Sequence, residues 1–415
     1  MSKSKARVGA IAALDVGSAK VCCFIAHAGD DGLRVTGIGH HLSRGLRAGA
    51  VIDMEAAEEA IRGAVDHAER MADETIHEVY LSFSAGAPAS HSVEVEVALN
   101  GHEIGDGDLR RVLGEGRLRC ESGEREIVHT IAVGYTIDGN RGIRDPRGMY
   151  GERLGVNIHV VTAQPAPLRN LTTCVARCHL DVADCVVSAY ASGLACLVDD
   201  ERELGVTVLD VGGGTTGVAV FIEDDVIHTD VVPIGGNHIT NDIARGLSTP
   251  LDHAERMKVL YGNAVPSPAD ERETIDVRLI GESEDASANP VPRAQLNRII
   301  RPRVEEIFEV VRARLEASGF ADTAGRRMVL TGGSSQLQGL RELASQIFGK
   351  SVRLGRPQDI HGLTEATGGP AFSTCAGLLQ YAIRRRLGLP EQPAGPYLGA
   401  NGRIGRIGQW FREHF

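Results

Sequence analysis

The sequence has few aromatic residues and no long apolar run. Phe, Trp and Tyr make up 4% of the 415 residues, and Trp410 is the single tryptophan. No stretch approaches the ~20 apolar residues that a membrane-spanning helix needs. The apolar stretch near the start is short and runs directly into a strand pattern, which argues against a cleaved signal peptide. No cysteine pair has the spacing of a zinc knuckle, so the eight cysteines are expected to be reduced, partly buried thiols of a cytosolic protein.

An excess of basic charge is also lacking. The net charge is −11, which gives no support to a broad nucleic-acid-binding face, so we expect no nucleic-acid partner. No GxxxxGK[ST] P-loop occurs, and the GxGxxG spacing at 212–217 lies between two apolar strand patterns instead of opening a helix, which argues against both of those nucleotide-binding folds. Apolar residues at 42% and charged residues at 24% are ordinary for a globular protein, so disorder over most of the length is excluded.

Two segments of the sequence share one pattern. Each has an apolar strand, then Asp, an apolar residue, Gly and small hydroxyl residues, and then a second apolar strand. The aspartates, Asp15 and Asp210, are 195 residues apart. An internal duplication predicts two related α/β halves that face one another, with one turn from each half lining the cleft.

A third turn, 331–335, follows another apolar strand and has the same composition. Glycines let the backbone N–H groups approach a phosphate closely, and Ser and Thr add short donors. In the first turn Asp15 is placed to hold Mg²⁺ through water, with Gly17, Ser18 and Lys20 facing phosphate. Asp210 and 212–216 have the same roles in the second turn, and 332–334 approach the nucleoside.

The other patterns divide the chain. Asp53 is a predicted N-cap for a helix over 54–71, and further helices are expected at 168–178, 189–198, 239–247, 253–260, 296–317, 337–348 and 374–386. From residue 85 to residue 163 the sequence pattern changes to strands with alternating apolar and polar residues, separated by charged, glycine-rich stretches. This change indicates an inserted subdomain. Residues 388–402 contain three prolines and are expected to be a linker.

These motifs carry a resemblance. LDVGSAKV, VTVLDVGGGTTGVAVF and VLTGGSSQLQGL resemble the phosphate-1, phosphate-2 and adenosine motifs of the actin-like ATPase superfamily, and PIGGNHITNDIA is similar too. The resemblance implies two duplicated RNase-H-like α/β halves around a cleft for ATP and Mg²⁺. It also implies that Glu255 and Lys258 reach ribose and adenine, although an exposed i,i+3 ion pair is the alternative. The nucleotide-binding set is then Asp15, Gly17, Ser18, Lys20, Asp210, Gly212, Gly213, Gly214, Thr215, Thr216, Gly235, Gly236, Glu255, Lys258, Gly332, Gly333 and Ser334.

Within the superfamily the chain most resembles the bacterial cell-division family FtsA, through DVGSAKVC, SAYASGLACL, IIRPRVEEIFE and the inserted subdomain. The resemblance implies a filament-forming adaptor that binds the C-terminal peptide of the tubulin-like protein FtsZ and recruits later division proteins at the inner membrane. It places the FtsZ contact at Arg303 and Glu306. It divides the chain into subdomain 1A (1–84, 164–204 and 370–387), 1C (85–163), 2A (205–246 and 324–369) and 2B (247–323).

The sequence departs from the superfamily beside the γ-phosphate. Many relatives place Gln, Glu or Asp on the segment that aligns with 188–192, where this chain has Ser188, and a serine cannot orient or deprotonate water in the same way. We therefore expect ATP binding with weak or absent hydrolysis. Alternative functions are a pilus-assembly platform protein or a small-molecule kinase of the same superfamily.

The last thirteen residues form a distinct amphipathic pattern over 403–415. Ile404, Ile407, Phe411 and Phe415 share one helical face with Trp410 at its edge. Arg403 and Arg406 flank this face, where each can attract anionic lipid headgroups by ~1 kcal/mol. The segment is too short to span a bilayer and suits the interface, so we expect peripheral attachment to the cytoplasmic face of the inner membrane at the division site. The alternative is a helix that docks on its own protein.

Overall fold

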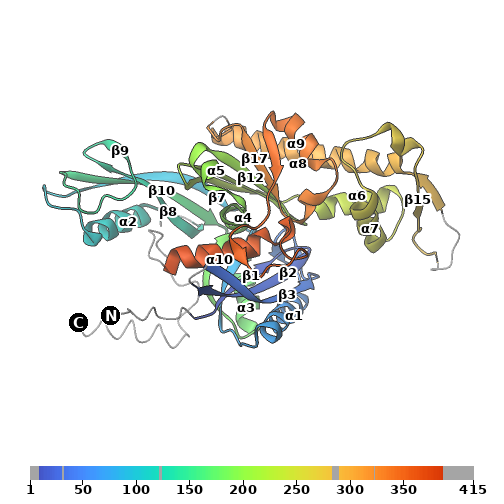
Figure 1. Ribbon diagram of the computed structural model, residues 1–415, viewed down its shortest axis with the longest axis horizontal. Helices are drawn as coiled ribbons and strands as arrows, with labels where there is room; N and C mark the ends of the chain where they lie inside the picture. The colour runs from blue at the N-terminus through green and yellow to red at the C-terminus, as the bar shows by residue number, and fades with distance from the viewer. Residues whose placement is uncertain (1–8, 30–31, 121–123, 283–288, 322, 387–415) are drawn as a thin grey trace.

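Two β-sheets face one another across a pair of helices in the computed structural model, which describes residues 9–29, 32–120, 124–282, 289–321 and 323–386 (Figure 1). The first sheet has the order β11-β6-β1-β2-β3-β19. Its strands are β1 (Ile11–Val16), β2 (Lys20–Gly29), β3 (Gly32–Leu42), β6 (Glu78–Phe83), β11 (Asp181–Val187) and β19 (Ile360–His361). The second sheet has the order β18-β17-β12-β13-β14-β7-β10-β8-β9. Its strands are β7 (Ala89–Ala98), β8 (Glu126–Ile137), β9 (Asn140–Ile143), β10 (Arg153–Ala163), β12 (Val206–Val211), β13 (Thr216–Ile222), β14 (Asp225–Val232), β17 (Arg327–Thr331) and β18 (Ser351–Leu354).

The predicted duplication is confirmed by the strand pairing. In the first half β1, β2 and β3 are antiparallel neighbours and β1 runs parallel to β6. In the second half β12, β13 and β14 are antiparallel neighbours and β12 runs parallel to β17. Asp15 and Asp210 therefore occupy the same place, near the end of the first strand of each half.

The helices pack against the two sheets. They are α1 (Met54–Ala72), α3 (Pro165–Arg177), α4 (Ser188–Cys196), α5 (Asp199–Leu204), α6 (Gly236–Gly246), α7 (Leu251–Tyr261), α8 (Arg293–Ser318), α9 (Leu340–Phe348) and α10 (Ser373–Arg386). Asp53 caps α1 as predicted, because its side chain accepts a hydrogen bond from the amide of Ala56. The helices α4 and α10 pack on each other between the sheets, and α4 contacts strands of both. Gly377 of α10 permits this close crossing, since a Cβ there would collide with the carbonyl of Ala191.

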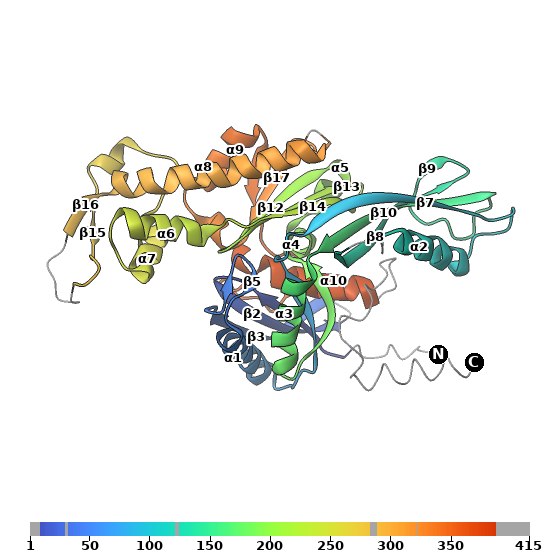
Figure 2. The same ribbon diagram turned by 180° about the vertical axis from the view of Figure 1, so that it is seen from behind.

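The other elements in the described part of the chain are short β-strands and 3₁₀ turns. Two two-stranded sheets consist of β4 (Leu46–Arg47) with β5 (Ala50–Val51) and of β15 (Thr274–Val277) with β16 (Asn289–Pro292). The 3₁₀ turns are Pro268–Glu271, Gly333–Gln336 and Pro370–Phe372. Figure 2 shows α6, α7, α8 and the β15–β16 pair extending to one side of the second half.

The inserted subdomain extends to the opposite side and contains β7, α2 (Asp106–Cys120), β8, β9 and β10 (Figure 2). Its own apolar core includes Val95, Val112 and Ile158. The strand β7 also meets β14 at the pair Ala89 and Asp230, so the insertion continues the sheet of the second half. The sequence analysis had no helix at α2, because the three glycines within that helix conceal its apolar face.

One strand belongs to the other half of the molecule from the one that the sequence predicted. Residues 324–369 were assigned to the second half, yet β19 pairs with β3 in the sheet of the first half. The returning chain adds an edge strand there before it enters α10, and a two-residue strand has no sequence pattern of its own.

The predicted linker 388–402 and the amphipathic segment with Arg403, Ile404, Arg406, Ile407, Trp410, Phe411 and Phe415 lie outside the described residues. Within the residues that are described, none of the helices has the length and apolar character needed to cross a bilayer.

Candidate nucleotide-binding site

The three predicted turns meet around one cavity of about 150 Å³ between the halves. The first and second turns face each other closely. A Cβ on Gly213 would lie 2.8 Å from Cβ of Ala19, and a Cβ on Gly214 would lie 2.5 Å from Oγ of Ser18. Predicted residues that line the cavity are Asp15, Gly17, Ser18, Lys20, Asp210, Gly212, Gly213, Gly214, Thr215, Gly332 and Gly333.

Hydroxyl groups hold the two aspartates. Ser82 donates a hydrogen bond of 2.7 Å to Oδ1 of Asp15. Ser192 and Thr374 lie 2.7 Å and 3.1 Å from Oδ2 of Asp210. Burial raises the pKa of Asp15, and burial raises the pKa of Asp210 to about 6 although the hydrogen bond from Ser192 opposes this shift. The pair is therefore costly to keep ionised without a compensating cation.

Lys20 supplies the cation nearest to these aspartates. Its Nζ is buried, has no hydrogen-bond acceptor among the described residues, and lies 3.2 Å from the ring centroid of Phe372. Burial lowers its pKa. A buried amino group with nothing to donate to is unfavourable, and a phosphate oxygen would satisfy it.

These features fit Mg²⁺ and a nucleotide phosphate. The carboxylates of Asp15 and Asp210 would hold the ion through water, and Lys20 with the glycine-rich turns would receive the phosphates. The bound Mg²⁺ would neutralise phosphate charge. Of the described residues that line the cavity, the ionisable ones are Asp15, Lys20 and Asp210, and Ser188 lines it as well.

Six predicted residues do not line this cavity. Thr216 is buried and donates to the carbonyl of Ile234, 2.8 Å away. Gly235 lies against the carbonyls of the second turn, and the amide of Gly236 donates to the carbonyl of Gly212 at 2.9 Å. Ser334 donates to that same carbonyl at 3.0 Å. The start of α6 is thus tied to the second and third turns.

Glu255 and Lys258 on α7 also make polar contacts with the start of α6. Lys258 is buried, with Nζ 2.6 Å from Glu255, 2.8 Å from Oγ1 of Thr240 and 3.2 Å from the carbonyl of Gly236. Burial lowers the pKa of Lys258. The exposed ion pair considered from the sequence is therefore wrong for the lysine, while the contact of both residues with ribose and adenine stays a prediction.

The sequence analysis missed several residues of this site. Ser84, Ala371 and Thr374 line the cavity, and Ser82 and Ser192 hold the aspartates. A single serine near the end of a strand or within a helix is a weak signal on its own, because its partner lies in another element of the fold. Gly217 also lines the cavity, and a Cβ there would lie 2.8 Å from Cβ of Ala189 on α4, so the close packing of α4 against this turn requires glycine.

The predicted FtsZ contact lies on α8. Arg303 is paired with Asp242 of α6, with Nε 2.6 Å from Oδ2 and Nη2 3.2 Å from Oδ1, and also with Glu306. The side chains of Arg303 and Glu306 are 26% and 47% exposed. The arginine charge is therefore already balanced in the protein alone.

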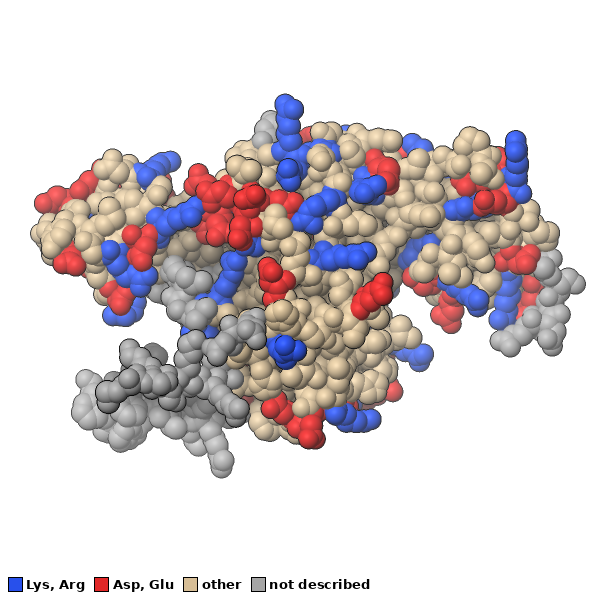
Figure 3. Space-filling model, in the orientation of Figure 1, with Lys and Arg blue, Asp and Glu red and all other residues tan. Residues whose placement is uncertain are grey.

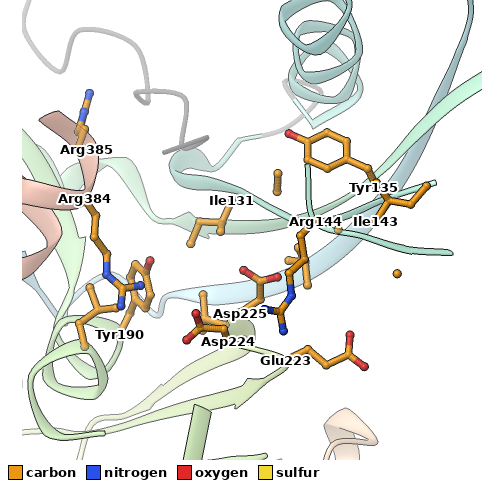
Figure 4. A pocket seen from close by; sticks show the side chains of 16 residues that line it. Ile131, Tyr135, Ile143, Arg144, Tyr190, Glu223, Asp224, Asp225, Arg384 and Arg385 are labelled. Carbon is orange, nitrogen blue, oxygen red and sulfur yellow. The ribbon is translucent and has the colours of Figure 1, made fainter. Parts of the chain in front are cut away.

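A larger cavity of about 300 Å³ lies where the insertion meets both halves (Figure 4). Arg144 of the insertion reaches over Glu223, Asp224 and Asp225 and is 2.6 Å from Glu203. Figure 3 shows acidic side chains gathered around α5. The end of α5 accepts backbone hydrogen bonds from Glu223 and Asp224. Burial, followed by the charge of Asp224, raises the pKa of Asp225 to about 7. The sequence analysis did not predict this cavity, because three separate segments form it.

Comparison with known proteins agrees with the sequence and the fold. The family model described as "Cell division protein FtsA" matches residues 207–377, and "SHS2 domain inserted in FTSA" matches 85–162. "Cell division protein FtsA" of Rhizobium meliloti is 45% identical and covers 98% of this chain and 95% of its own. The Escherichia coli K12 protein of the same name is 33% identical and covers 98% of each.

Solved structures show the fold. The structure titled "PilM-PilN type IV pilus biogenesis complex" has a TM-score of 0.64 at 17% identity and covers 91% of this chain and 99% of its own. The ADP-bound MreB5 of Spiroplasma citri has a TM-score of 0.53 at 14% identity and covers 91% and 98%. The fold is thus the predicted actin-like α/β fold with an inserted domain, and the chain belongs to the FtsA family of cell-division proteins.

Proposed function

We propose that the chain is an ATP-binding adaptor that forms actin-like filaments and tethers FtsZ to the cytoplasmic face of the inner membrane at the division site. The observation that carries the nucleotide part is the meeting of three glycine-rich turns around the half-buried Asp15, the buried Asp210 and the amino group of Lys20, which has no hydrogen-bond acceptor among the described residues. Membership in the FtsA family supports the role in division. Later division proteins are recruited to the same assembly.

Hydrolysis of the bound ATP is slow in this proposal. A rapid hydrolase needs a group that orients or deprotonates the attacking water. The hydroxyl of Ser188 is a poor base, and Asp15 and Asp210 are each held by hydroxyl donors and committed to the metal ion. The nucleotide then acts mainly by holding the two halves together for assembly.

Vesicle recruitment tests the whole proposal. The full chain with Mg-ATP is mixed with vesicles that contain anionic phospholipid, purified FtsZ is added, and both proteins are measured in the pellet after centrifugation. We expect the chain to sediment with the vesicles and to bring FtsZ with it. A chain that stays in the supernatant, or one that sediments without FtsZ, contradicts the tethering role.

Replacement of Trp410 by glutamate should release the chain from vesicles. Burial of a large apolar side chain contributes ~1.5–3 kcal/mol, and a factor of ten in affinity is 1.4 kcal/mol, so we expect a loss of more than ten-fold. Leu118→Glu is the matched control, because Leu118 is an exposed apolar side chain on α2 (66% exposed). Equal vesicle binding by Trp410→Glu and the parent would exclude the tail as the anchor.

Replacement of Arg303 by glutamate should weaken binding of an FtsZ tail peptide about five-fold. The new carboxylate would stand beside Asp242 and Glu306 and repel an acidic peptide. Fluorescence anisotropy of a labelled peptide gives the dissociation constant. Arg298→Glu is the control on the same helix, because Arg298 is 70% exposed and pairs with Glu271 elsewhere on the surface. An unchanged constant for Arg303→Glu would move the contact to another site.

A further inference from the structure

The hydrogen bonds that hold Asp15 and Asp210 differ in origin. Asp15 on β1 is held by Ser82 on β6, and both strands belong to the sheet of the first half. Asp210 on β12 belongs to the second half, yet Ser192 on α4 and Thr374 on α10 hold it. The helix α10 packs on strands of the first half, whereas α4 lies between the halves and packs on strands of both. Thr374 therefore holds the second aspartate from the first half, and Ser192 holds it from the helix between the halves.

The geometry limits how this contact can work. Ser192 and Thr374 lie 2.9 Å apart, and both lie within hydrogen-bond distance of the same oxygen, Oδ2 of Asp210. Each hydroxyl has one proton, so when both donate to Asp210 neither can donate to the other. The three side chains are buried, with 0%, 8% and 8% exposure for Ser192, Thr374 and Asp210, so water does not replace these bonds. Oδ1 of Asp210 accepts no hydrogen bond from the residues that the structure describes and remains available to a ligand.

Movement of the halves would break this arrangement. If the second half turned away from α10, Asp210 would lose the hydrogen bond from Thr374, which is made to a buried charge and is therefore stronger than a bond between neutral groups. Asp15 would keep its bond to Ser82, because both lie in one sheet. The orientation of Asp210 thus depends on closure of the cleft, whereas that of Asp15 does not.

We propose that Ser192 and Thr374 are positioning residues for Asp210 and that the contact from Thr374 on α10 is a latch between the halves, fixing Asp210 for the metal ion and coupling metal binding to closure of the cleft. The inference rests on the proposed nucleotide site and names residues that act within it. A metal ion held through Asp210 favours the orientation that the latch selects. Closure, in turn, presents that orientation to the ion, as reciprocal coupling requires.

Variants at Thr374 separate the hydroxyl from the volume. Thr374→Val removes the hydroxyl and keeps the shape, whereas Thr374→Ser keeps the hydroxyl. Calorimetry measures ATP binding by the full chain with Mg²⁺ and then with EDTA. We expect Thr374→Val to weaken binding about ten-fold with Mg²⁺ and less than two-fold with EDTA, and Thr374→Ser to restore the parent value. Ser192→Ala, which leaves only a small space, should behave like Thr374→Val.

Amide hydrogen exchange tests the coupling. Saturating Mg-ATP should slow exchange in α4 and α10 of the parent and of Ser345→Ala, whose lost bond to the carbonyl of Lys350 lies within the second half and away from the cleft. The slowing should be absent in Thr374→Val. Equal Mg-ATP affinity, or equal slowing, in the parent and Thr374→Val overturns the latch while the nucleotide site stands. A folded parent that binds no ATP in either buffer overturns the nucleotide site and the latch together.

Discussion

Replacement of Gly213 by valine is expected to abolish nucleotide binding while the protein stays folded. Gly213 lines the cavity, and even a Cβ there would lie 2.8 Å from Cβ of Ala19 on the facing turn and 3.1 Å from Oδ1 of Asn237. The two branches of valine extend further, so they would fill the space that phosphates need or force the turns apart. Calorimetry with Mg-ATP should detect no binding, and thermal unfolding should show one cooperative transition.

A matched valine elsewhere controls for the loss of a glycine. Gly107 lies in the first turn of α2, where an added Cβ meets no atom within 4 Å. Gly107→Val should bind Mg-ATP like the parent. If Gly213→Val bound Mg-ATP with parent affinity, the cavity between the turns would not be the phosphate site.

The nucleotide turns were predictable from the sequence because each is local. An apolar strand, an aspartate and a glycine-rich bend fit within a dozen residues, and the second copy at Asp210 repeats the first at Asp15. The strand pairing then follows, since a repeated pattern implies repeated topology. Similar local signals placed α1 with its cap at Asp53 and α8 within a few residues of its observed ends.

What the sequence did not predict depends on contacts between distant segments. The pairing of β19 with β3 and of β7 with β14 joins residues far apart in the chain, and neither strand edge has a distinctive composition. The burial of Lys258 was not predicted, because helical spacing alone does not show that the start of α6 covers this side chain. Thr374 was expected only as the first residue of a helix, and its function depends on where Asp210 lies.

Buried histidines give the second large effect, on stability against pH. His159 on β10 is completely buried near His228, His129 and His91, and burial lowers the pKa of His159 to about 3. Burial, with a smaller effect of the charge of Arg385, also lowers the pKa of His129 to about 3. Nε2 of His129 accepts a hydrogen bond of 3.0 Å from the amide of Val187, so a proton on that nitrogen would break the bond.

The sign of the effect follows from the two states. In the unfolded chain a histidine takes up a proton near pH 6.5, whereas in the folded protein these two stay neutral to about pH 3. Their contribution to the free energy of unfolding is therefore full above pH 6.5 and falls as the pH drops below it. The carboxyls of Asp210 and Asp225, with pKa values raised to about 6 and about 7, act in the opposite direction over part of this range. These opposite contributions partly cancel, so the free energy of unfolding of the parent changes less with pH than the histidines alone would make it.

Comparing a histidine variant with the parent separates the histidine contribution to the free energy of unfolding from the opposing contribution of the aspartates. His159→Phe keeps a buried ring but cannot take up a proton in the unfolded state. Relative to the parent, its free energy of unfolding should rise by about 2 kcal/mol between pH 7 and pH 5, whatever the constant offset from repacking. Asp225→Asn should show the opposite trend, gaining most relative to the parent at pH 8, because it removes a carboxylate that the folded protein disfavours. Urea unfolding at pH 5, 7 and 8 measures both differences, and a pH-independent difference for His159→Phe would mean that His159 is already protonated or solvated in the folded protein.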